Sequence, residues 1–406
     1  MSKKEQEMQP QINIGLVGHV DHGKTTLTKA LSGKWTDTHS EELKRGITIR
    51  LGYADSTFYH NAKTNEYSPV PKKDFEPKRK VSFIDAPGHE SLMATMLAGS
   101  MIMDGALLLV SANEQCPQPQ TREHLSALEM CGITNVIVVQ NKIDLVSQEQ
   151  AQENYKQIKE FLSDSTYKDA PIIPISAEHG INISFLIQAI EQYIPTPKRE
   201  NEQQPLMLVA RSFDVNKPGS DPSQMQGGIL GGSLLKGKLQ VGDTIEIRPG
   251  RLIEKKNQFD AKPYVTKITN IMAGIQQIES ATPGGSIALL TELDPAVVKG
   301  DKLAGNVVGI QGELPPVWST IKLKAHLLKR VVGASDAAVV EPLRKGEPLM
   351  LNVNAATTVG FITELSKKET VLSLRLPVCA AVGDRVTLSR RIANRFRLIG
   401  YGIITQ

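Results

Sequence analysis

The segment that most constrains the fold joins an apolar run, a glycine-containing loop and a helical stretch within residues 12–31. Ile12–Val17 predicts a strand, and Thr26–Leu31 predicts a helix. Between them, residues 18–25 read G-H-V-D-H-G-K-T, which matches the phosphate-loop pattern G-x-x-x-x-G-K-T. In this context backbone N–H groups surround phosphate oxygens, the lysine neutralises them, and the threonine hydroxyl can bind Mg²⁺. The residues predicted to contact the nucleotide here are Asp21, His22, Gly23, Lys24, Thr25 and Thr26.

Two later loops indicate which base is bound. Asn141-Lys142-Ile143-Asp144 follows the apolar run Val136–Val139, and Ser176-Ala177-Glu178 follows Ile172–Ile175. The Asp144 carboxylate can accept hydrogen bonds from the N1–H and N2–H₂ groups of guanine, a donor pair that adenine lacks. A backbone N–H of the second loop can meet guanine O6. The sequence therefore predicts a site for GTP and GDP.

Two stretches between these loops are predicted to sense the γ-phosphate. Asp85 follows an apolar strand and can hold Mg²⁺ through water, while the Gly88 N–H can reach the γ-phosphate. Upstream, Thr48 offers a second hydroxyl ligand, although its spacing also fits an ordinary strand threonine. Loops held by one phosphate and one cation form a switch that collapses on hydrolysis. Asp21 either makes a loop hydrogen bond or, with the Gly46 carbonyl, binds a second Mg²⁺.

Four motifs, in this order, carry a family resemblance: G-H-V-D-H-G-K-T, R-G-I-T-I, D-A-P-G-H-E and N-K-I-D. Together they resemble the translational GTPases related to elongation factor Tu. Residues 40–54, 117–124 and 211–219 further resemble the gamma subunit of archaeal and eukaryotic initiation factor two, and the chain length suits the archaeal form. The resemblance runs from about residue 10 to the C-terminus.

This resemblance implies a cytoplasmic GTPase that delivers methionyl initiator tRNA to the small ribosomal subunit, in a complex with alpha and beta subunits. It also implies that His89 orients the attacking water, with Lys24, Thr48 and Mg²⁺ completing the catalytic site. Three alternatives stay open. One is an elongator- or selenocysteine-type tRNA carrier, another is a metabolic GTPase such as a sulfate-activation subunit, and the third is a scaffold that binds GTP without hydrolysing it.

Residues 55–80 depart from the family pattern. Members often carry two C-x-x-C pairs in this region, whereas this segment has no cysteine and only His60 as a nitrogen ligand. A Zn²⁺ site needs about four thiolate or imidazole ligands, so zinc is not expected. Because the segment is long, polar and rich in proline, we predict an irregular surface insertion.

Patterning along the chain predicts three domains. Apolar runs alternate with helical stretches over residues 10–195, which is typical of a parallel sheet covered by helices. A polar, proline-containing linker follows, and then short strands separated by glycine pairs. We therefore predict an α/β P-loop GTPase domain (1–200) followed by two β-barrel domains (205–312 and 316–406).

Bulk composition is that of a globular protein without a membrane segment. The chain has 406 residues, too many for a single core. Its three cysteines form no spaced pair, and no apolar run reaches about 18 residues. The net charge of +4 permits RNA binding without requiring it.

The most basic segment lies near the C-terminus. Arg385, Arg390, Arg391, Arg395 and Arg397 fall within 13 positions that also contain Phe396. Strand alternation would put several guanidinium groups on one face, with Phe396 facing away, and arginine suits RNA phosphates. A solvated charged face is the alternative. Residues that could extend this face are Lys322, Lys324, Lys329 and Arg330.

Overall fold

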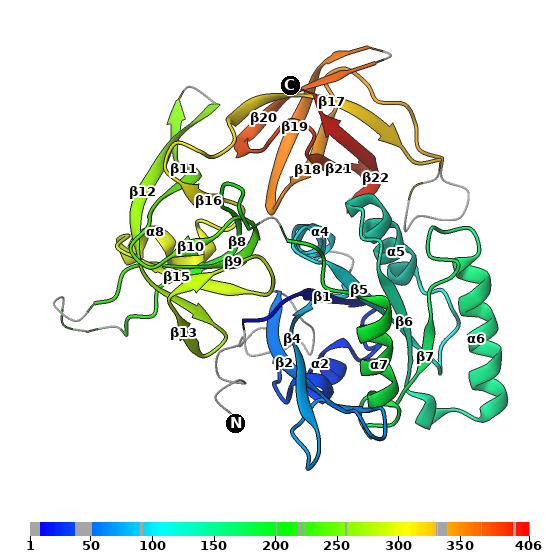
Figure 1. Cartoon of the computed structure of the whole chain (residues 1–406). Helices are drawn as coiled ribbons and strands as arrows, with labels where there is room; N and C mark the ends of the chain where they lie inside the picture. Colours follow the sequence, from blue (N-terminus) through cyan, green and yellow to red (C-terminus); the bar gives the residue numbers. More distant parts are fainter. Residues whose placement is uncertain are drawn as a thin grey trace. The chain divides into compact units, whose positions relative to one another are not determined.

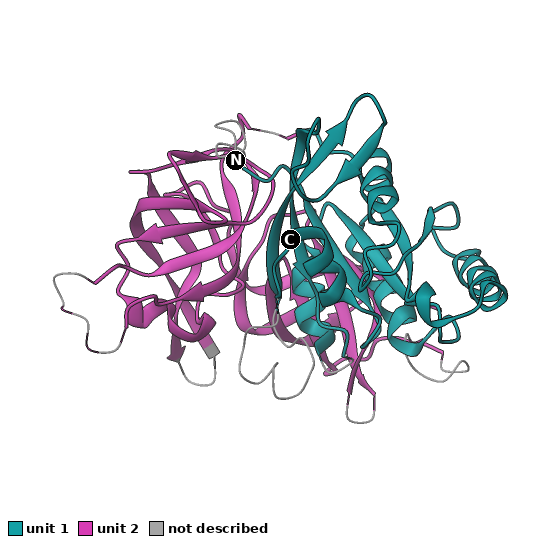
Figure 2. Ribbon diagram, turned by 90° about the horizontal axis from the view of Figure 1, so that it is seen from below, with its two compact units in different colours: residues 1–198 teal, residues 199–406 magenta. Residues whose placement is uncertain are grey.

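The computed structural model forms two compact units, residues 1–198 and 199–406 (Figures 1 and 2). The residues that it describes are 9–36, 51–89, 92–199, 201–217, 219, 221, 225–255, 258–329, 331, 339–366, 368–392 and 395–405.

A seven-stranded sheet forms the centre of the first unit, in the order β3-β2-β4-β1-β5-β6-β7. Its strands are β1 (Asn13–Gly18), β2 (Gly52–Asn61), β3 (Glu66–Ser68), β4 (Glu76–Asp85), β5 (Gly105–Ser111), β6 (Val136–Asn141) and β7 (Ile172–Pro174). The five strands from β4 to β7 in this order are parallel. Every residue of β1, β5 and β6 is buried, as expected for parallel strands covered on both faces.

The helices of this unit alternate with its strands, as the pattern over residues 10–195 predicts. They are α2 (Lys24–Ser32), α4 (Met93–Ser100), α5 (Pro119–Cys131), the 3₁₀ turn η2 (Ile143–Leu145), α6 (Gln148–Leu162) and α7 (Ile183–Tyr193). Ser147 and Gln150 form a capping box that begins α6. Gly132 ends α5 in the left-handed conformation, which glycine adopts without strain.

The prediction of an irregular insertion at residues 55–80 is wrong. Strands β2 and β4 pair in antiparallel register from Gly52 opposite Asp85 to His60 opposite Glu76, and β3 adds to β2. Polar residues concealed the strands because they alternate with buried ones along this edge of the sheet. Pro77 is accommodated where the register shifts, which is where a ladder tolerates a missing N–H.

Arg79 ties β4 to the end of α7 and provides a stability prediction. Its buried guanidinium donates from Nε to Glu191 Oε1 at 2.8 Å and from Nη1 to the Ile194 carbonyl at 3.0 Å. Replacing Arg79 with alanine leaves the half-buried Glu191 carboxylate without this partner, so we expect the free energy of unfolding to fall by about 3 kcal/mol. Urea denaturation measures this change. The control is Lys78→Ala, since Lys78 is exposed on the same strand; equal losses in both variants would contradict the assignment.

The second unit contains two β-barrels, which confirms the predicted fold class. In the first barrel the strands run β11-β16-β8-β9-β15-β12, β12 pairs back with β11, and β13 is attached to β12. Its elements are β8 (Leu206–Phe213), β9 (Ile229–Lys236), β10 (Leu239–Gln240), β11 (Thr244–Lys255), β12 (Gln258–Ala273), β13 (Gln276–Ile278), β14 (Ser280–Ala281), β15 (Ile287–Thr291), α8 (Pro295–Val298), η4 (Lys299–Asp301) and β16 (Val307–Ile310).

The second barrel closes in the order β17-β20-β19-β18-β21-β22. Its strands are β17 (Val317–Leu327), β18 (Pro348–Val353), β19 (Ala356–Leu365), β20 (Thr370–Cys379), β21 (Arg385–Ile392) and β22 (Arg395–Ile404). Each barrel has its own buried aliphatic core.

Candidate guanine-nucleotide site

The phosphate loop connects the end of β1 to the start of α2. Gly18 has φ 143°, and a Cβ placed on it would lie 2.5 Å from the Leu109 carbonyl oxygen, so only glycine fits. The Gly18 N–H donates to Nδ1 of His124, on α5, at 2.7 Å. At the other end of the loop, Gly23 has φ 90° and leads into α2. The loop therefore enters the helix in the geometry that the motif predicts.

Lys24 lies inside this loop. Its Nζ donates to the carbonyls of Gly18 at 3.0 Å and His19 at 2.7 Å, which holds the ammonium group over the loop. A Cβ on Gly88 would approach Lys24 Nζ to 2.5 Å, so the backbone of the segment that follows Asp85 passes directly beside the lysine. His89 follows with its side chain exposed. The structure brings Lys24 and Gly88 together, and the roles of Lys24, Gly88 and His89 stay predictions.

The predicted magnesium ligands are partly assembled. Asp85 Oδ2 accepts hydrogen bonds from Thr25 Oγ1 at 2.8 Å and Thr36 Oγ1 at 2.6 Å. A hydroxyl and a carboxylate in contact fit Mg²⁺, which prefers oxygen ligands. Thr48 and Gly46 lie outside the described residues. Among those described, no group of three His, Cys, Asp or Glu residues could hold a metal by itself.

The loops predicted to bind guanine are joined to the phosphate loop by Asn141. Its Nδ2 donates to the His22 carbonyl at 2.9 Å, and its Oδ1 accepts from the Ala177 N–H at 3.0 Å. Beyond it, Lys142 has positive φ and precedes η2, which carries Asp144. A hydrogen bond from Ser176 lowers the pKa of Asp144, which keeps its carboxylate ionised and able to accept.

Glu178 and Thr26 are the remaining predicted nucleotide contacts. Glu178 is exposed in the loop that follows Ala177, and Thr26 is half-buried in the first turn of α2. Both lie on the segments that the motifs predict, and neither has a contact that tests its role.

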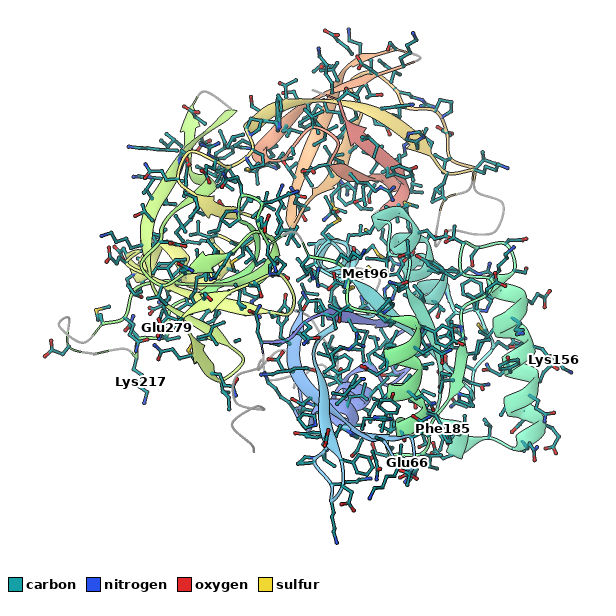
Figure 3. The ribbon with its side chains drawn as sticks, in the orientation of Figure 1. Glu66, Met96, Lys156, Phe185, Lys217 and Glu279 are labelled. Atoms are coloured by element: carbon teal, nitrogen blue, oxygen red, sulfur yellow. The ribbon has the colours of Figure 1, made fainter. Side chains whose placement is uncertain are left out.

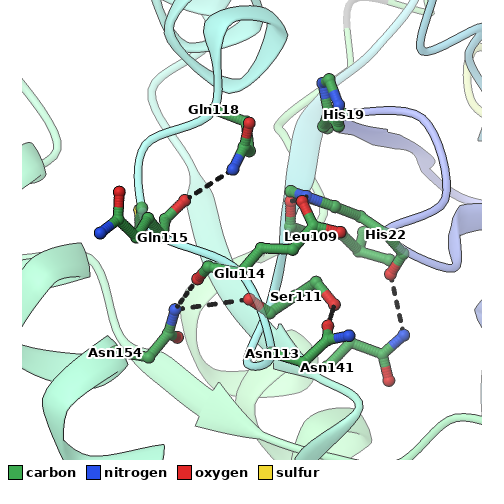
Figure 4. Close-up of polar contacts among 12 residues, drawn as sticks. His19, His22, Leu109, Ser111, Asn113, Glu114, Gln115, Gln118, Asn141 and Asn154 are labelled. Atoms are coloured by element: carbon green, nitrogen blue, oxygen red, sulfur yellow. Dashed lines mark hydrogen bonds and ion pairs between the residues drawn. The ribbon is translucent and has the colours of Figure 1, made fainter. Parts of the chain in front are cut away.

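Two histidines of the phosphate loop, His19 and His22, lie close to a third, His124 of α5. His22 is completely buried, and its ring lies between the Leu109 carbonyl and the Glu114 carboxylate (Figure 4). The His19 and His22 ring centroids are 5.2 Å apart. Burial lowers the pKa of His19, of His22 and of His124.

His124 gives a pH prediction. Burial lowers its pKa to about 3, whereas in the unfolded chain it titrates near 6.5. Below pH 6.5 the unfolded chain therefore binds a proton that the folded chain does not, and stability falls as the pH decreases toward 3. At pH 5 the loss is about 2 kcal/mol. His124→Asn keeps an acceptor for the Gly18 N–H but does not titrate in this range. The urea unfolding midpoint should therefore change less between pH 7.5 and pH 5 in the variant than in wild type. An equal change in the two proteins would contradict the prediction.

Sequence reasoning missed His124, Glu114 and Thr36. His124 belongs to the segment 117–124 that carries the family resemblance, which was the only available signal for it. Glu114 and Thr36 lie outside any motif, and their contacts span 92 and 49 positions in the chain. Only the folded sheet reveals them.

The C-terminal arginines divide between the two faces of the β21–β22 hairpin. Arg390 lies opposite Arg397, and Arg391 lies opposite Phe396. Directly opposite residues share a face, so Arg390 and Arg397 lie on one face, and Phe396 lies on the other face together with Arg391. Arg390 is also held by the Glu347 carboxylate and donates to the carbonyls of Glu341 and Pro342. The Arg390 guanidinium therefore makes bonds within the second barrel and is not a candidate for contact with RNA phosphates. Arg330, one of the residues predicted to extend the face, lies outside the described residues.

Among the helices that the structure describes, none has the length and apolar character needed to cross a membrane.

Comparison with protein families matches both ends of the chain. The family described as the elongation factor Tu GTP binding domain matches residues 9–196, and the family described as initiation factor eIF2 gamma, C terminal, matches residues 319–404. The two matches correspond to the first unit and to the second barrel.

Among solved structures, the bacterial selenocysteine-specific elongation factor EF-Sec aligns with a TM-score of 0.75 and 26% identity over 98% of this chain. This chain spans 58% of the length of that protein. Elongation factor SelB from Methanococcus maripaludis, in complex with the GTP analogue GPPNHP, aligns with a TM-score of 0.73 and 23% identity over 98% of this chain and 80% of that one. These similarities establish the shared fold.

Curated relatives are much closer in sequence. Translation initiation factor 2 subunit gamma from Pyrococcus abyssi is 56% identical over 411 residues, and the one from Methanocaldococcus jannaschii is 54% identical over 409 residues. Both alignments cover 100% of this chain and of the relative. The chain therefore belongs to the family of translation initiation factor 2 gamma subunits.

Proposed function

We propose that this protein is a GTP-dependent carrier of methionyl initiator tRNA. It works with alpha and beta subunits at the small ribosomal subunit and releases the tRNA after hydrolysing GTP to GDP and phosphate. The observation that carries the proposal is Asn141, which joins the phosphate loop to the base-binding loop in a chain that aligns over its full length with gamma subunits.

The chain's own residues account for nucleotide binding by position and charge. Lys24 places its ammonium group where phosphate charge collects, and the N–H groups at the start of α2 point toward the same place. Asp144 and the Ala177 loop read the base. Magnesium, held by Thr25 and by Asp85 through water, with Thr48 as a further ligand, supplies charge neutralisation when bound.

The proposed change of shape on GTP hydrolysis depends on the segment around Gly88, whose backbone lies beside Lys24. Gly88 lies where its N–H can meet a γ-phosphate, and His89 lies beside it to orient water. Loss of the γ-phosphate removes the contact that orders this segment, which is how GTPase switches change shape. Arg385, Arg391, Arg395 and Arg397 are the candidate contacts to RNA phosphates, with Arg390 excluded.

The test is a binding measurement with methionyl initiator and methionyl elongator tRNA, in the presence of the partner subunits. Each tRNA is titrated with the protein loaded with a non-hydrolysable GTP analogue or with GDP. We expect tighter binding of the initiator tRNA in the GTP-analogue form. Equal binding of both tRNAs would indicate an elongator-like carrier, and no tRNA binding by a chain that still binds GTP would overturn the proposal.

A further inference from the structure

The His22 ring is held from both sides by residues outside the phosphate loop. Its Nδ1 lies 2.9 Å from the Leu109 carbonyl oxygen, and its Nε2 lies 3.3 Å from Glu114 Oε2 (Figure 4). A carbonyl oxygen only accepts hydrogen bonds, so Nδ1 carries a hydrogen, and the contact with the acceptor-only Glu114 carboxylate is a hydrogen bond when Nε2 carries one as well. The ring is 0% exposed, whereas the Glu114 side chain is 32% exposed. Glu114 therefore reaches from the edge of the unit inward to fix a buried ring.

Glu114 is itself held by α6. Asn154, buried on the inner side of this helix, donates from Nδ2 to the Glu114 carbonyl at 2.8 Å and to the Ser111 carbonyl at 3.4 Å. One turn later, Gln157 Oε1 accepts from the Cys116 N–H at 3.0 Å. These bonds fix the backbone on both sides of Glu114, so α6 determines where its carboxylate lies.

At the other end of this chain of contacts, His22 occupies a strained part of the loop. Asp21, immediately before it, has φ 62°, and Gly23, immediately after it, has φ 90°. A positive φ at a non-glycine residue costs on the order of 1 kcal/mol and persists only where the surroundings hold the backbone. The same backbone turn directs the loop N–H groups toward the phosphate position. Holding the His22 ring therefore holds the phosphate-binding conformation of the loop.

We propose that Glu114 is a positioning residue for the phosphate loop, acting through His22 and held in place by Asn154. The hydrogen bond from Asn154 to the Glu114 backbone and the contact of the Glu114 carboxylate with the His22 ring together set how tightly the loop retains guanine nucleotide. The inference rests on the proposed nucleotide site, and it adds two residues that lie outside every nucleotide-binding motif.

The first test compares Glu114→Ala with Glu114→Gln. Alanine removes the partner of His22 Nε2, whereas the glutamine amide can still form a hydrogen bond with it. We expect fluorescent GDP to dissociate about tenfold faster from the alanine variant and within roughly twofold of wild type from the glutamine variant. Gln115→Ala is the matched control, because Gln115 is the exposed neighbour in the same loop, and it should leave the rate unchanged.

The second test uses the nucleotide-free protein. Hydrogen exchange at the N–H groups of residues 23–26 should be faster in Glu114→Ala than in wild type, with the glutamine variant restoring protection. A loss of general stability would instead speed exchange across the whole unit and would not be rescued selectively by glutamine. This readout does not depend on bound GTP or on hydrolysis.

Asn154→Ala tests whether α6 acts through Glu114. Its control is Lys156→Ala, since Lys156 is exposed and points away from the sheet on the same helix (Figure 3). If Asn154 acts through Glu114, the double variant Asn154→Ala, Glu114→Ala should release GDP no faster than Glu114→Ala alone. Additive effects would overturn the role assigned to Asn154.

The outcomes separate this inference from the proposed function. If the wild-type chain binds no guanine nucleotide, the proposed function is wrong, and hydrogen exchange alone decides the role of Glu114. If wild type binds GDP but Glu114→Ala and Gln115→Ala both behave like it in dissociation and in exchange, Glu114 does not position the loop.

Discussion

Replacing Asp144 with asparagine is expected to weaken GTP binding by roughly 10³-fold. The hydrogen bond from Ser176 keeps the Asp144 carboxylate ionised, and both of its oxygens are acceptors. An asparagine presents an NH₂ group to the N2–H₂ group of guanine, so a donor faces a donor. A base with a carbonyl oxygen at that position accepts from the new amide instead.

The measurement is a calorimetric titration of wild type and Asp144→Asn with GTP and with xanthosine triphosphate. We expect the variant to prefer xanthosine triphosphate. The matched control is Asp169→Asn, which changes an exposed aspartate of the same unit and should leave GTP affinity unchanged. If Asp144→Asn binds GTP within about threefold of wild type, the base contact assigned to Asp144 is wrong.

Replacing His89 with alanine is expected to slow GTP hydrolysis by about 10²- to 10³-fold while leaving GTP affinity nearly unchanged. The separation follows from the structure. His89 is exposed beside Gly88, whereas Lys24, the residue proposed to hold phosphate, is buried. Removing the imidazole therefore removes the group that orients water without disturbing the phosphate contacts.

Single-turnover hydrolysis and equilibrium GTP binding measure the two quantities separately. His60→Ala provides the control, because His60 lies at the opposite end of β2 from Gly52, which pairs with Asp85. Its hydrolysis rate should equal that of wild type. An unchanged rate in His89→Ala would remove His89 from the catalytic site, and a parallel loss of GTP affinity would make it a binding residue instead.

Much of the first unit follows from local sequence, because its strands are continuous apolar runs next to recognisable loops. The apolar runs Ile12–Val17 and Val136–Val139 lie in β1 and β6, and every residue of these strands is buried. Strands buried on both faces need no alternation, so they stand out from their surroundings. The phosphate loop, Asn141 and Asp85 then follow from their places at the strand ends.

The prediction for residues 55–80 was wrong because the strands of this segment are not continuous apolar runs. Phe58 is completely buried, yet its neighbours in β2 include polar and half-buried residues, because this strand lies toward the edge of the sheet. Prolines 69 and 71 suggested a loop, and they lie between β3 and β4 rather than within them. Antiparallel pairing between two such strands depends on long-range register, which composition does not reveal.

The residues that hold the site in place could not be predicted from local sequence either. His124, Glu114 and Asn154 have no spacing relation to the phosphate loop, and their contacts arise because α5, β5 and α6 meet around it. Motifs identify the groups that touch a ligand. The groups that hold those residues in place are identified only once the sheet order is known.

The most direct test of the central claim, that the first unit is a guanine-specific switch site, is a calorimetric titration of the wild-type chain with GTP, GDP and ATP in the presence of Mg²⁺. The account predicts binding of both guanine nucleotides and affinity for ATP that is roughly 10³-fold weaker, because adenine cannot satisfy Asp144. Comparable affinity for ATP and GTP would contradict it.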